Sequence, residues 1–143
     1  MKKIIFGLCA LFACFVFTSC SHDPEKAIDQ VKDLAKKAEK IKTPQEYLDL
    51  YEDFYHAQID LYKGNPTKKQ IKTFNKEASE FYSAMSECER DFKKSEKKEL
   101  KNLRKEKSFK KKMLELEYEL AKAKIDFDDQ NKDKDDDDDD DDY

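Results

Sequence analysis

The amino-acid sequence predicts an all-α protein: an antiparallel helical bundle or hairpin of three to four helices, with a long C-terminal helix and a disordered acidic tail. Residues 20–125 contain a single glycine, Gly64, and only three prolines, so turns are scarce. Between these residues, apolar side chains recur every three or four positions, as on one face of an α-helix. We therefore expect one helical domain over residues 20–125 with a modest core, followed by an acidic tail over residues 126–143.

The first helix is expected to begin at Pro24, because Asp23 can cap free N–H groups and proline is favoured at the first helical position. Its apolar residues are Ile28, Val31, Leu34, Ala35, Ala38 and Ile41. The second helix is expected to begin after Thr43, which matches a capping box with Glu46, and to end at Gly64. Its apolar residues are Tyr47, Leu48, Tyr51, Phe54, Tyr55, Ile59 and Tyr62.

The third helix is expected after Thr67, which matches a second capping box with Gln70. Its apolar residues keep a 3-4 spacing for three heptads and are Ile71, Phe74, Ala78, Phe81, Met85, Cys88 and Phe92. Such heptads suit an intramolecular bundle and a coiled-coil dimer equally well, and both interpretations stay open.

Beyond Phe92 the apolar pattern breaks. Residues 93–99 contain no apolar side chain, and the pattern resumes out of register at Leu100, Leu103, Phe109, Met113, Leu116 and Leu120. With no glycine or proline after Pro66, one helix can run from Lys68 to about Ile125, roughly 85 Å at 1.5 Å per residue. A bend near Ser95 fits the pattern equally well.

Charge is divided unevenly along the chain. The segment from Arg90 to Lys112 holds 12 basic and 4 acidic residues, a net charge of +8. Its field would attract phosphates of nucleic acid or lipopolysaccharide, so it is a candidate site for an anionic polymer, although no nucleic-acid recognition fold is visible. The plainer alternative is a solvated, lysine-rich helix face. A third is that the acidic tail folds back over the basic segment.

The tail over residues 126–143 carries 12 acidic and 2 basic residues, a net charge of −10. Asp135 to Asp142 form an uninterrupted run, which is expected to be disordered because like charges repel and nothing apolar compensates. Its carboxylates can bind Ca²⁺ weakly, or they can keep the protein soluble. An EF-hand is excluded, because the glycine turn and the spaced glutamate of that loop are missing.

Motifs for catalysis and metal binding are scarce. With one glycine after residue 20, a glycine-rich phosphate loop is excluded, and neither H-E-x-x-H nor a Cys-x-x-Cys zinc ligand pair occurs. We expect no catalytic residue, no metal and no cofactor. His56 has Glu52 and Asp60 four residues to either side, on one helix face, which can hold a metal weakly. A solvated face with i,i+4 charge pairs is the favoured interpretation.

The aromatic residues of the second helix offer two interpretations. Tyrosines can line a ligand groove, since each provides apolar area and a polar tip. At helical spacing such residues usually form core, and we expect core for Phe54 and at least two tyrosines. The remaining tyrosines are candidates for contacting a partner.

The N-terminal segment predicts export. Lys2 and Lys3 form a short cationic region, and residues 4–17 follow without a charge. Such a segment is typical of a secretory signal peptide, and at 14 residues it is too short for a spanning helix, which needs about 20.

A cysteine follows the apolar segment: residues 17–20 are Phe17, Thr18, Ser19 and Cys20. The pattern resembles the lipobox of bacterial lipoproteins, where an apolar residue and two small ones precede a lipidated cysteine. The resemblance implies a signal peptide over residues 1–19 and a mature chain that begins at Cys20, with diacylglycerol on sulfur and a fatty acid such as palmitate on nitrogen. Such a double attachment is effectively permanent. Ser21, rather than aspartate, after the cysteine implies the outer membrane.

The cysteine count fits this interpretation. Cys9 and Cys14 leave with the signal peptide, and acylation consumes Cys20, which leaves Cys88 as the only free thiol. The mature chain is therefore not a disulfide scaffold. Cys88 lies on an apolar stripe, where a small buried hydrophobe is its expected role. If Cys20 is not acylated, Cys20 and Cys88 can pair.

Two functions follow. The first is a lipid-anchored protein of the bacterial cell envelope, not an enzyme, that acts as an interaction or structural module with a protein partner. The alternative is a soluble secreted protein that binds anionic polymer or divalent cations through its lysine-rich helix and its aspartate tail. In the first case Cys20 is the functional residue. In the second, the functional parts are the segment from Arg90 to Lys112 and the run from Asp135 to Asp142.

Overall fold

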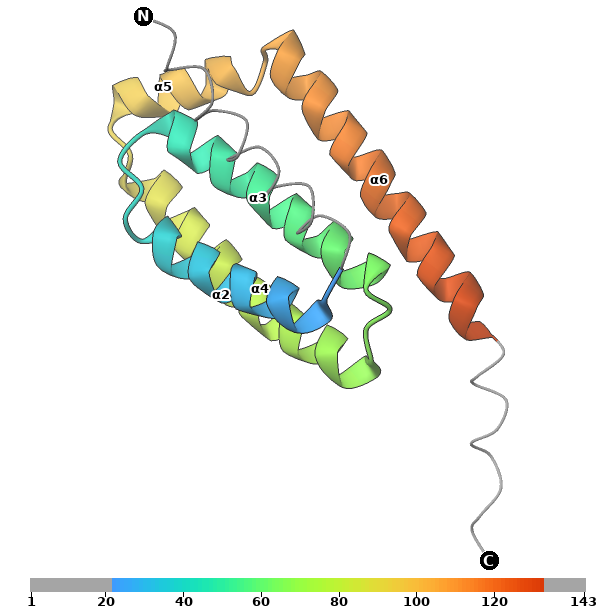
Figure 1. The fold of residues 1–143 in the computed structure, drawn as a ribbon. Helices are drawn as coiled ribbons and strands as arrows, with labels where there is room; N and C mark the ends of the chain where they lie inside the picture. Colours follow the sequence, from blue (N-terminus) through green and yellow to red (C-terminus); the bar gives the residue numbers. More distant parts are fainter. Residues whose placement is uncertain (1–21, 133–143) are drawn as a thin grey trace, which may run out of the picture.

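The computed structural model of the chain describes residues 22–132, which form five helices and no strand. The helices are α2 (Pro24–Ala38), α3 (Pro44–Lys63), α4 (Lys68–Asp91), α5 (Lys94–Leu103) and α6 (Lys107–Asn131). In Figure 1, α2, α3 and α4 lie side by side, α5 crosses one end of this bundle, and α6 returns along its outer edge. The prediction of an all-helical domain is confirmed.

The starts of the first three helices follow the predicted caps. Asp23 Oδ1 accepts a hydrogen bond from the Glu25 N–H at 3.0 Å, with Pro24 in the first turn. At α3, Thr43 and Glu46 make both bonds of a capping box, and at α4, Thr67 and Gln70 do the same. These bonds satisfy N–H groups that a helix start otherwise leaves without partners, so the boundaries are fixed by local sequence.

The helix directions are not purely antiparallel. Gln70 in the first turn of α4 donates to Glu25 in the first turn of α2 at 2.7 Å, so α2 and α4 run in the same direction and α3 runs against both. Asn131 at the end of α6 donates to Asn65 just after α3 at 3.2 Å, so α6 runs parallel to α3. α6 can run parallel to α3 because α5 crosses the end of the bundle before α6 begins (Figure 1).

The main apolar core lies between α2, α3 and α4. Its largest fully buried side chains include Tyr47, Phe54, Phe74 and Phe81, and the rings of Phe54 and Phe81 stack with centroids 4.6 Å apart. Each fully buried side chain of this size contributes roughly 1.5–3 kcal/mol of transfer free energy. The third-helix heptads are therefore used within one chain, since Phe74, Ala78, Phe81 and Met85 are all buried there.

A second, smaller cluster joins α6 to α3. Ile59 of α3 packs with Leu116 and Leu120 of α6, with Tyr55, Tyr62 and Met113 at its margin. α3 is thus flanked on both sides. Leu50, Ala57 and Leu61, which the sequence pattern did not single out, are buried in the main core. Both clusters consist of residues between Ala27 and Leu120, so the described domain contains its own core.

The segment expected to be one long helix, or one helix with a bend near Ser95, is broken twice. α4 ends at Asp91, and Phe92 adopts an extended backbone with ψ 139°, which brings its ring to 5.9 Å from that of Tyr47. The Lys93 N–H then donates to Glu96 at 2.7 Å and starts α5. The second break separates α5 from α6. Burial of Phe92 is the physical reason that the helix stops before Ser95.

The helical part of the chain extends past residue 126, where the tail is expected to begin. α6 continues to Asn131 because the ring of Phe127 packs on that of Tyr62 at 5.6 Å and Asn131 contacts Asn65. The aspartate run, Asp135 to Asp142, lies outside the described residues. Among the helices of residues 22–132, none has the length and hydropathy that crossing a lipid bilayer requires.

Candidate functional site

The described residues begin at a well-anchored end of the domain. Cys20 and the predicted signal peptide are outside the described residues. His22, two residues later, places Nδ1 at 2.8 Å from Oδ1 of Asp60, near the end of α3. The described chain therefore begins at the end of the bundle where α2 begins and α3 and α6 end.

The basic segment lies at the other end. Residues 90–112 cover the end of α4, all of α5 and the start of α6, and α3 alone separates the two ends by about 30 Å at 1.5 Å per residue. Some of its charges are used inside the fold: Lys97 Nζ donates to the Arg90 carbonyl at 2.8 Å, and Lys112 pairs with Glu52. Besides Lys97, the lysines of this segment that are exposed at and around α5 are Lys93, Lys94, Lys98, Lys101, Lys105, Lys107 and Lys110.

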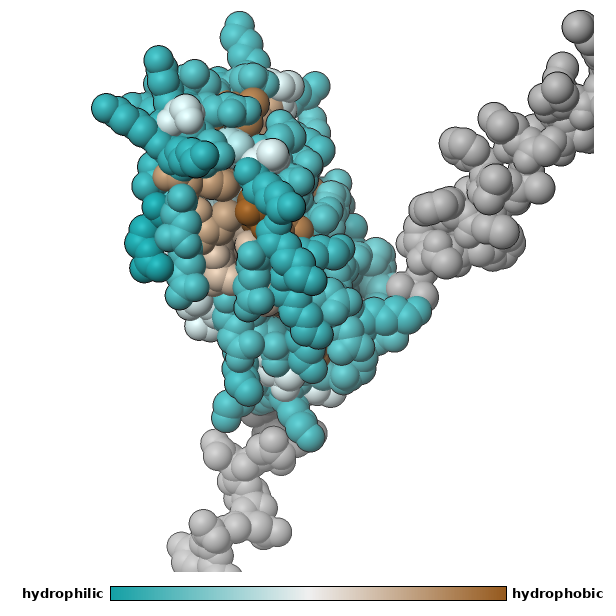
Figure 2. Space-filling model, turned by 90° about the vertical axis from the view of Figure 1, so that its left-hand side faces the viewer, coloured by the Kyte–Doolittle hydropathy of each residue, from teal (hydrophilic) through white to brown (hydrophobic). Residues whose placement is uncertain are grey.

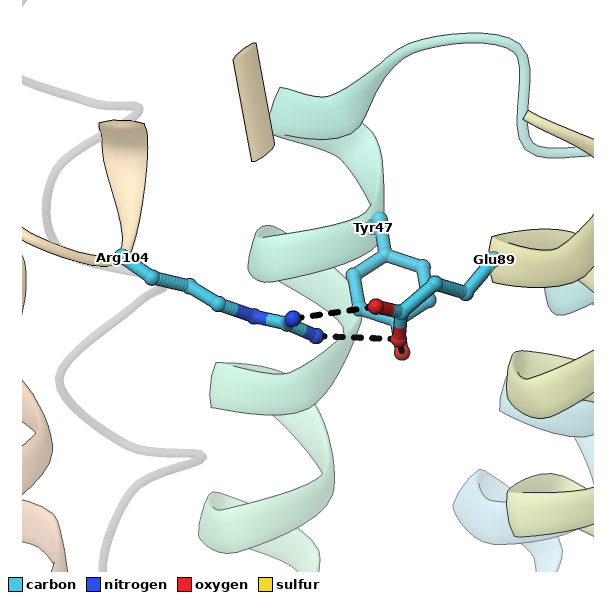
Figure 3. A network of polar contacts seen from close by, with 3 residues as sticks. All are labelled: Tyr47, Glu89 and Arg104. Atoms are coloured by element: carbon cyan, nitrogen blue, oxygen red, sulfur yellow. Dashed lines mark hydrogen bonds and ion pairs between the residues drawn. The ribbon is translucent and has the colours of Figure 1, made fainter. Parts of the chain in front are cut away.

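A polar cluster holds α5 against the bundle. The Tyr47 hydroxyl of α3 donates to Glu89 Oε2 of α4 at 2.7 Å. Arg104, at the end of α5, donates from Nη1 and Nη2 to the two carboxylate oxygens of Glu89 at 3.0 and 3.1 Å. Its guanidinium carbon also lies 5.5 Å from the centre of the Tyr47 ring. Figure 3 shows the three side chains converging from three elements.

The charges of this cluster suit a structural role, and we call Tyr47, Glu89 and Arg104 the clasp. The bidentate hydrogen bonds from Arg104 hold the pKa of Glu89 below its usual range. Burial, reinforced by the bond to Glu89, raises the pKa of Tyr47, so the phenol keeps its proton and remains a donor. A neutral phenol, a carboxylate and a guanidinium that satisfy one another fix the angle at which α5 leaves α4.

The candidate metal ligands around His56 are not brought together. Asp60 binds His22, Glu52 binds Lys112, and His56 itself is exposed. Within residues 22–132, no three histidine, cysteine or acidic side chains are gathered so that they could hold a metal ion. Glu52 and Asp60 therefore serve contacts between elements, which i,i+4 reasoning on one helix does not reveal.

The aromatic residues of α3 form core, as expected for Phe54 and at least two tyrosines. Phe54 and Tyr47 are fully buried, and Tyr51 and Tyr62 pack against the main cluster. Tyr55 packs against the cluster between α3 and α6. Burial raises the pKa of Tyr55 and of Tyr62. These side chains thus join helices rather than line a ligand groove.

A shallow cleft of about 320 Å³ lies where α2 and α4 end. Its lining residues are Ala38, Glu39, Ile41, Lys42, Ala84, Glu87, Cys88, Asp91, Phe92 and Glu96. Figure 2, which views this side of the molecule, shows an apolar patch surrounded by hydrophilic side chains. Burial raises the pKa of the Cys88 thiol, which keeps it protonated and poorly nucleophilic. Cys88 is half-buried at the core margin, in line with its expected role as a small hydrophobe.

The most distinctive surface is the outer face of α6. Leu114, Tyr118 and Ile125 are 65%, 72% and 59% exposed, on the side of α6 away from Leu116 and Leu120. In Figure 1, α6 lies at the edge of the assembly with only α3 beside it along its length. We call the stripe Leu114, Tyr118, Ala121 and Ile125 the α6 seam.

The chain was compared with protein-family models, with curated proteins and with solved structures, and none of the three comparisons found a match.

Sequence reasoning missed both the clasp and the seam. Glu89 and Arg104 are 15 residues apart, on elements whose angle the local sequence does not specify, so nothing in the pattern paired them. The seam did carry a signal: Leu114, Tyr118 and Ile125 belong to a second apolar stripe, out of phase with the one through Leu116 and Leu120.

Proposed function

We propose that this chain is a non-enzymatic interaction module of the bacterial cell envelope, anchored by lipid at Cys20 and contacting a protein partner through the α6 seam. The observation that carries the proposal is the seam itself. Isolated exposed apolar residues are normal on a protein surface, but apolar residues that line up on one face of a helix mark an interaction surface.

The non-enzymatic part is supported by the roles of the polar side chains. The contacts of Glu89, Glu52 and Asp60 each join different elements of the fold, and the resulting pairs stabilise the arrangement of helices. The envelope part is supported by the signal peptide and the lipobox-like pattern ending at Cys20. Ser21 favours the outer membrane. Two residues of extended chain span at most about 7 Å, so a lipid on Cys20 would attach near His22, opposite the α5 end, which stays accessible to partners.

The test of the anchor is the intact mass of the mature protein, purified from a bacterial membrane fraction. We expect a species that starts at Cys20 and carries the added mass of the acyl chains. The variant Cys20→Ala should leave the membrane fraction, whereas Cys88→Ala, a thiol change within the same domain, should remain there. Membrane association that survives Cys20→Ala would refute the anchor.

A second candidate function is binding of an anionic polymer at the α5 end, favoured by the exposed lysines that gather there. If it holds, Lys98→Gln with Lys101→Gln should weaken binding to heparin and reduce its dependence on salt. The matched control is Lys72→Gln with Lys76→Gln, two exposed lysines of α4 outside the basic segment. Equal effects of the two pairs would argue against a specific site at α5.

A further inference from the structure

The α6 seam has the spacing of a coiled-coil stripe. Leu114, Tyr118, Ala121 and Ile125 are separated by four, three and four residues, so they occupy alternating core positions of a heptad. All four are exposed. The chain has four large hydrophobic side chains that are exposed among its described residues, and Leu114, Tyr118 and Ile125 are three of them. The seam is therefore built like half of a helix–helix interface.

The seam fits an antiparallel copy of itself. If Tyr118 of one chain faces Ala121 of the other, Leu114 faces Ile125 in the next layer, and the same layers recur on the other side of the centre. Each pairing is reciprocal, as a two-fold interface between identical chains requires. A large side chain also faces a smaller one in the central layers, which lets the helices approach each other.

The charges beside the seam complement one another in this register. Glu115 of one chain lies beside Lys122 of the other, and Glu117 lies beside Lys124, on the two flanks where an antiparallel pair brings equivalent heptad positions together. Both pairs occur twice by symmetry. All four side chains are exposed. Within one chain Glu115 lies 3.9 Å from Lys111, and Lys124 lies over the Tyr62 ring, so the contacts across the pair would compete with these.

The ends of the seam discriminate between the two orientations. In the antiparallel register Lys111 lies opposite Asp128, an attractive pair. In a parallel, in-register pair Lys111 would face Lys111 and Asp128 would face Asp128, and both contacts are repulsive. Antiparallel helices also place the positive end of one macrodipole beside the negative end of the other. Charge therefore favours the antiparallel arrangement.

We propose that two copies of this chain associate through α6 of each, antiparallel, with Tyr118 packed on Ala121 and Leu114 packed on Ile125. This inference rests on the role proposed above for the α6 seam and not on the lipid anchor. Four seam residues a side make a small interface, typical of weak, reversible association.

The first experiment is sedimentation velocity of the chain from Ser21 onward, which contains the whole self-contained domain, at a series of concentrations. We expect a reversible monomer–dimer equilibrium whose dissociation constant rises at least tenfold in Tyr118→Glu. Tyr118 is exposed, so this variant should keep the circular dichroism of the parent. The control is Glu119→Ala, an exposed neighbour off the seam. A chain that stays monomeric at every concentration, or a Glu119→Ala variant as weakened as Tyr118→Glu, would overturn the proposal.

The second experiment fixes the orientation by oxidative cross-linking in a Cys88→Ala background. A chain with Leu114→Cys and a separate chain with Ile125→Cys should cross-link strongly when mixed. Each alone should cross-link poorly, because identical positions lie about 16 Å apart, 11 residues at 1.5 Å per residue. Strong self-cross-linking of Leu114→Cys, without a gain on mixing, would mean a parallel pair. Either failure leaves the anchor at Cys20 untouched, since membrane fractionation tests it separately.

Discussion

The hydroxyl oxygen of Tyr47 lies 2.7 Å from Oε2 of Glu89, across the interface between α3 and α4. The same carboxylate accepts two hydrogen bonds from Arg104, so one glutamate links three elements. Tyr47 itself is only 1% exposed, and its ring packs on Phe92, the residue at which α4 ends. The break between α4 and α5 and the clasp that holds α5 are therefore one structural feature.

Tyr47→Phe should weaken the fold modestly. The substitution removes one hydrogen bond and keeps the ring, so we expect the free energy of unfolding in urea to fall by about 0.5–1.5 kcal/mol. The control is Tyr118→Phe, on the exposed face of α6, which should change it little. A Tyr47→Phe variant as stable as the parent would show that the hydroxyl bond adds nothing to the clasp.

The clasp should weaken in acid. Because the pKa of Glu89 in the folded state lies below the ordinary value of 4.5, its contribution to stability is complete above that value and is lost as pH falls through the folded-state pKa. Glu89→Gln should therefore lower the unfolding free energy at pH 7, and the difference from the parent should shrink below pH 4.5. Unfolding in urea across this pH range measures it. A difference independent of pH would mean that Glu89 acts through its shape and not through its charge.

Gly64→Ala should destabilise the end of the bundle that carries His22. A Cβ atom on Gly64 would lie 2.6 Å from Cδ of Pro24 and 2.8 Å from the His22 carbonyl oxygen, so the start of the chain must shift. Overpacking of this kind costs about 1–3 kcal/mol. Adding Pro24→Ala removes the ring but not the His22 carbonyl, and should restore only part of the loss. The thermal midpoints of the parent and the two variants give the comparison, and an unchanged midpoint for Gly64→Ala would contradict the contact.

Cys20 and Cys88 should not form a bridge within one folded chain. His22 contacts Asp60 and Glu25 contacts Gln70, at the end of the bundle where α4 begins. Cys88 lies about 27 Å along α4 from Gln70, at 1.5 Å per residue. A disulfide needs Cα atoms within about 7 Å. An unacylated chain that begins at Cys20 should therefore keep two titratable thiols under mild oxidation in dilute solution. Recovery of an intramolecular bridge under native conditions would show that this end of the domain opens.

Ile59→Ala should loosen α6 more than the rest of the fold. Ile59 is the contribution of α3 to the small cluster with Leu116 and Leu120, and truncating a buried isoleucine costs about 2–5 kcal/mol. Amide hydrogen exchange should accelerate most along α6 and least along α2, which packs in the separate main core. Leu34→Ala, in that main core, is the control and should accelerate exchange across the bundle. Uniform acceleration by Ile59→Ala would show that the two clusters unfold together.

The sequence by itself determined the local structure of this protein. Three helix starts follow from Asp23, Thr43 and Thr67, because a cap is a bond between a side chain and backbone only two or three residues away. The apolar faces of the first three helices were readable for a similar reason, since periodicity reports which side of a helix avoids water. The predicted signal peptide and the expected role of Cys20 also depend on short stretches of sequence.

Only the tertiary structure decided how these helices combine. Burial of Phe92 ends α4 before Ser95. Packing of Phe127 on Tyr62 extends α6 to Asn131, past residue 125, where the charge pattern predicted the start of a tail. The clasp joins residues that are distant in the chain, and no local pattern pairs them. The α6 seam is exposed because the other apolar stripe of α6, through Leu116 and Leu120, packs on α3. Periodicity shows that a helix has an apolar face, but which face is covered depends on contacts between segments that are far apart in sequence.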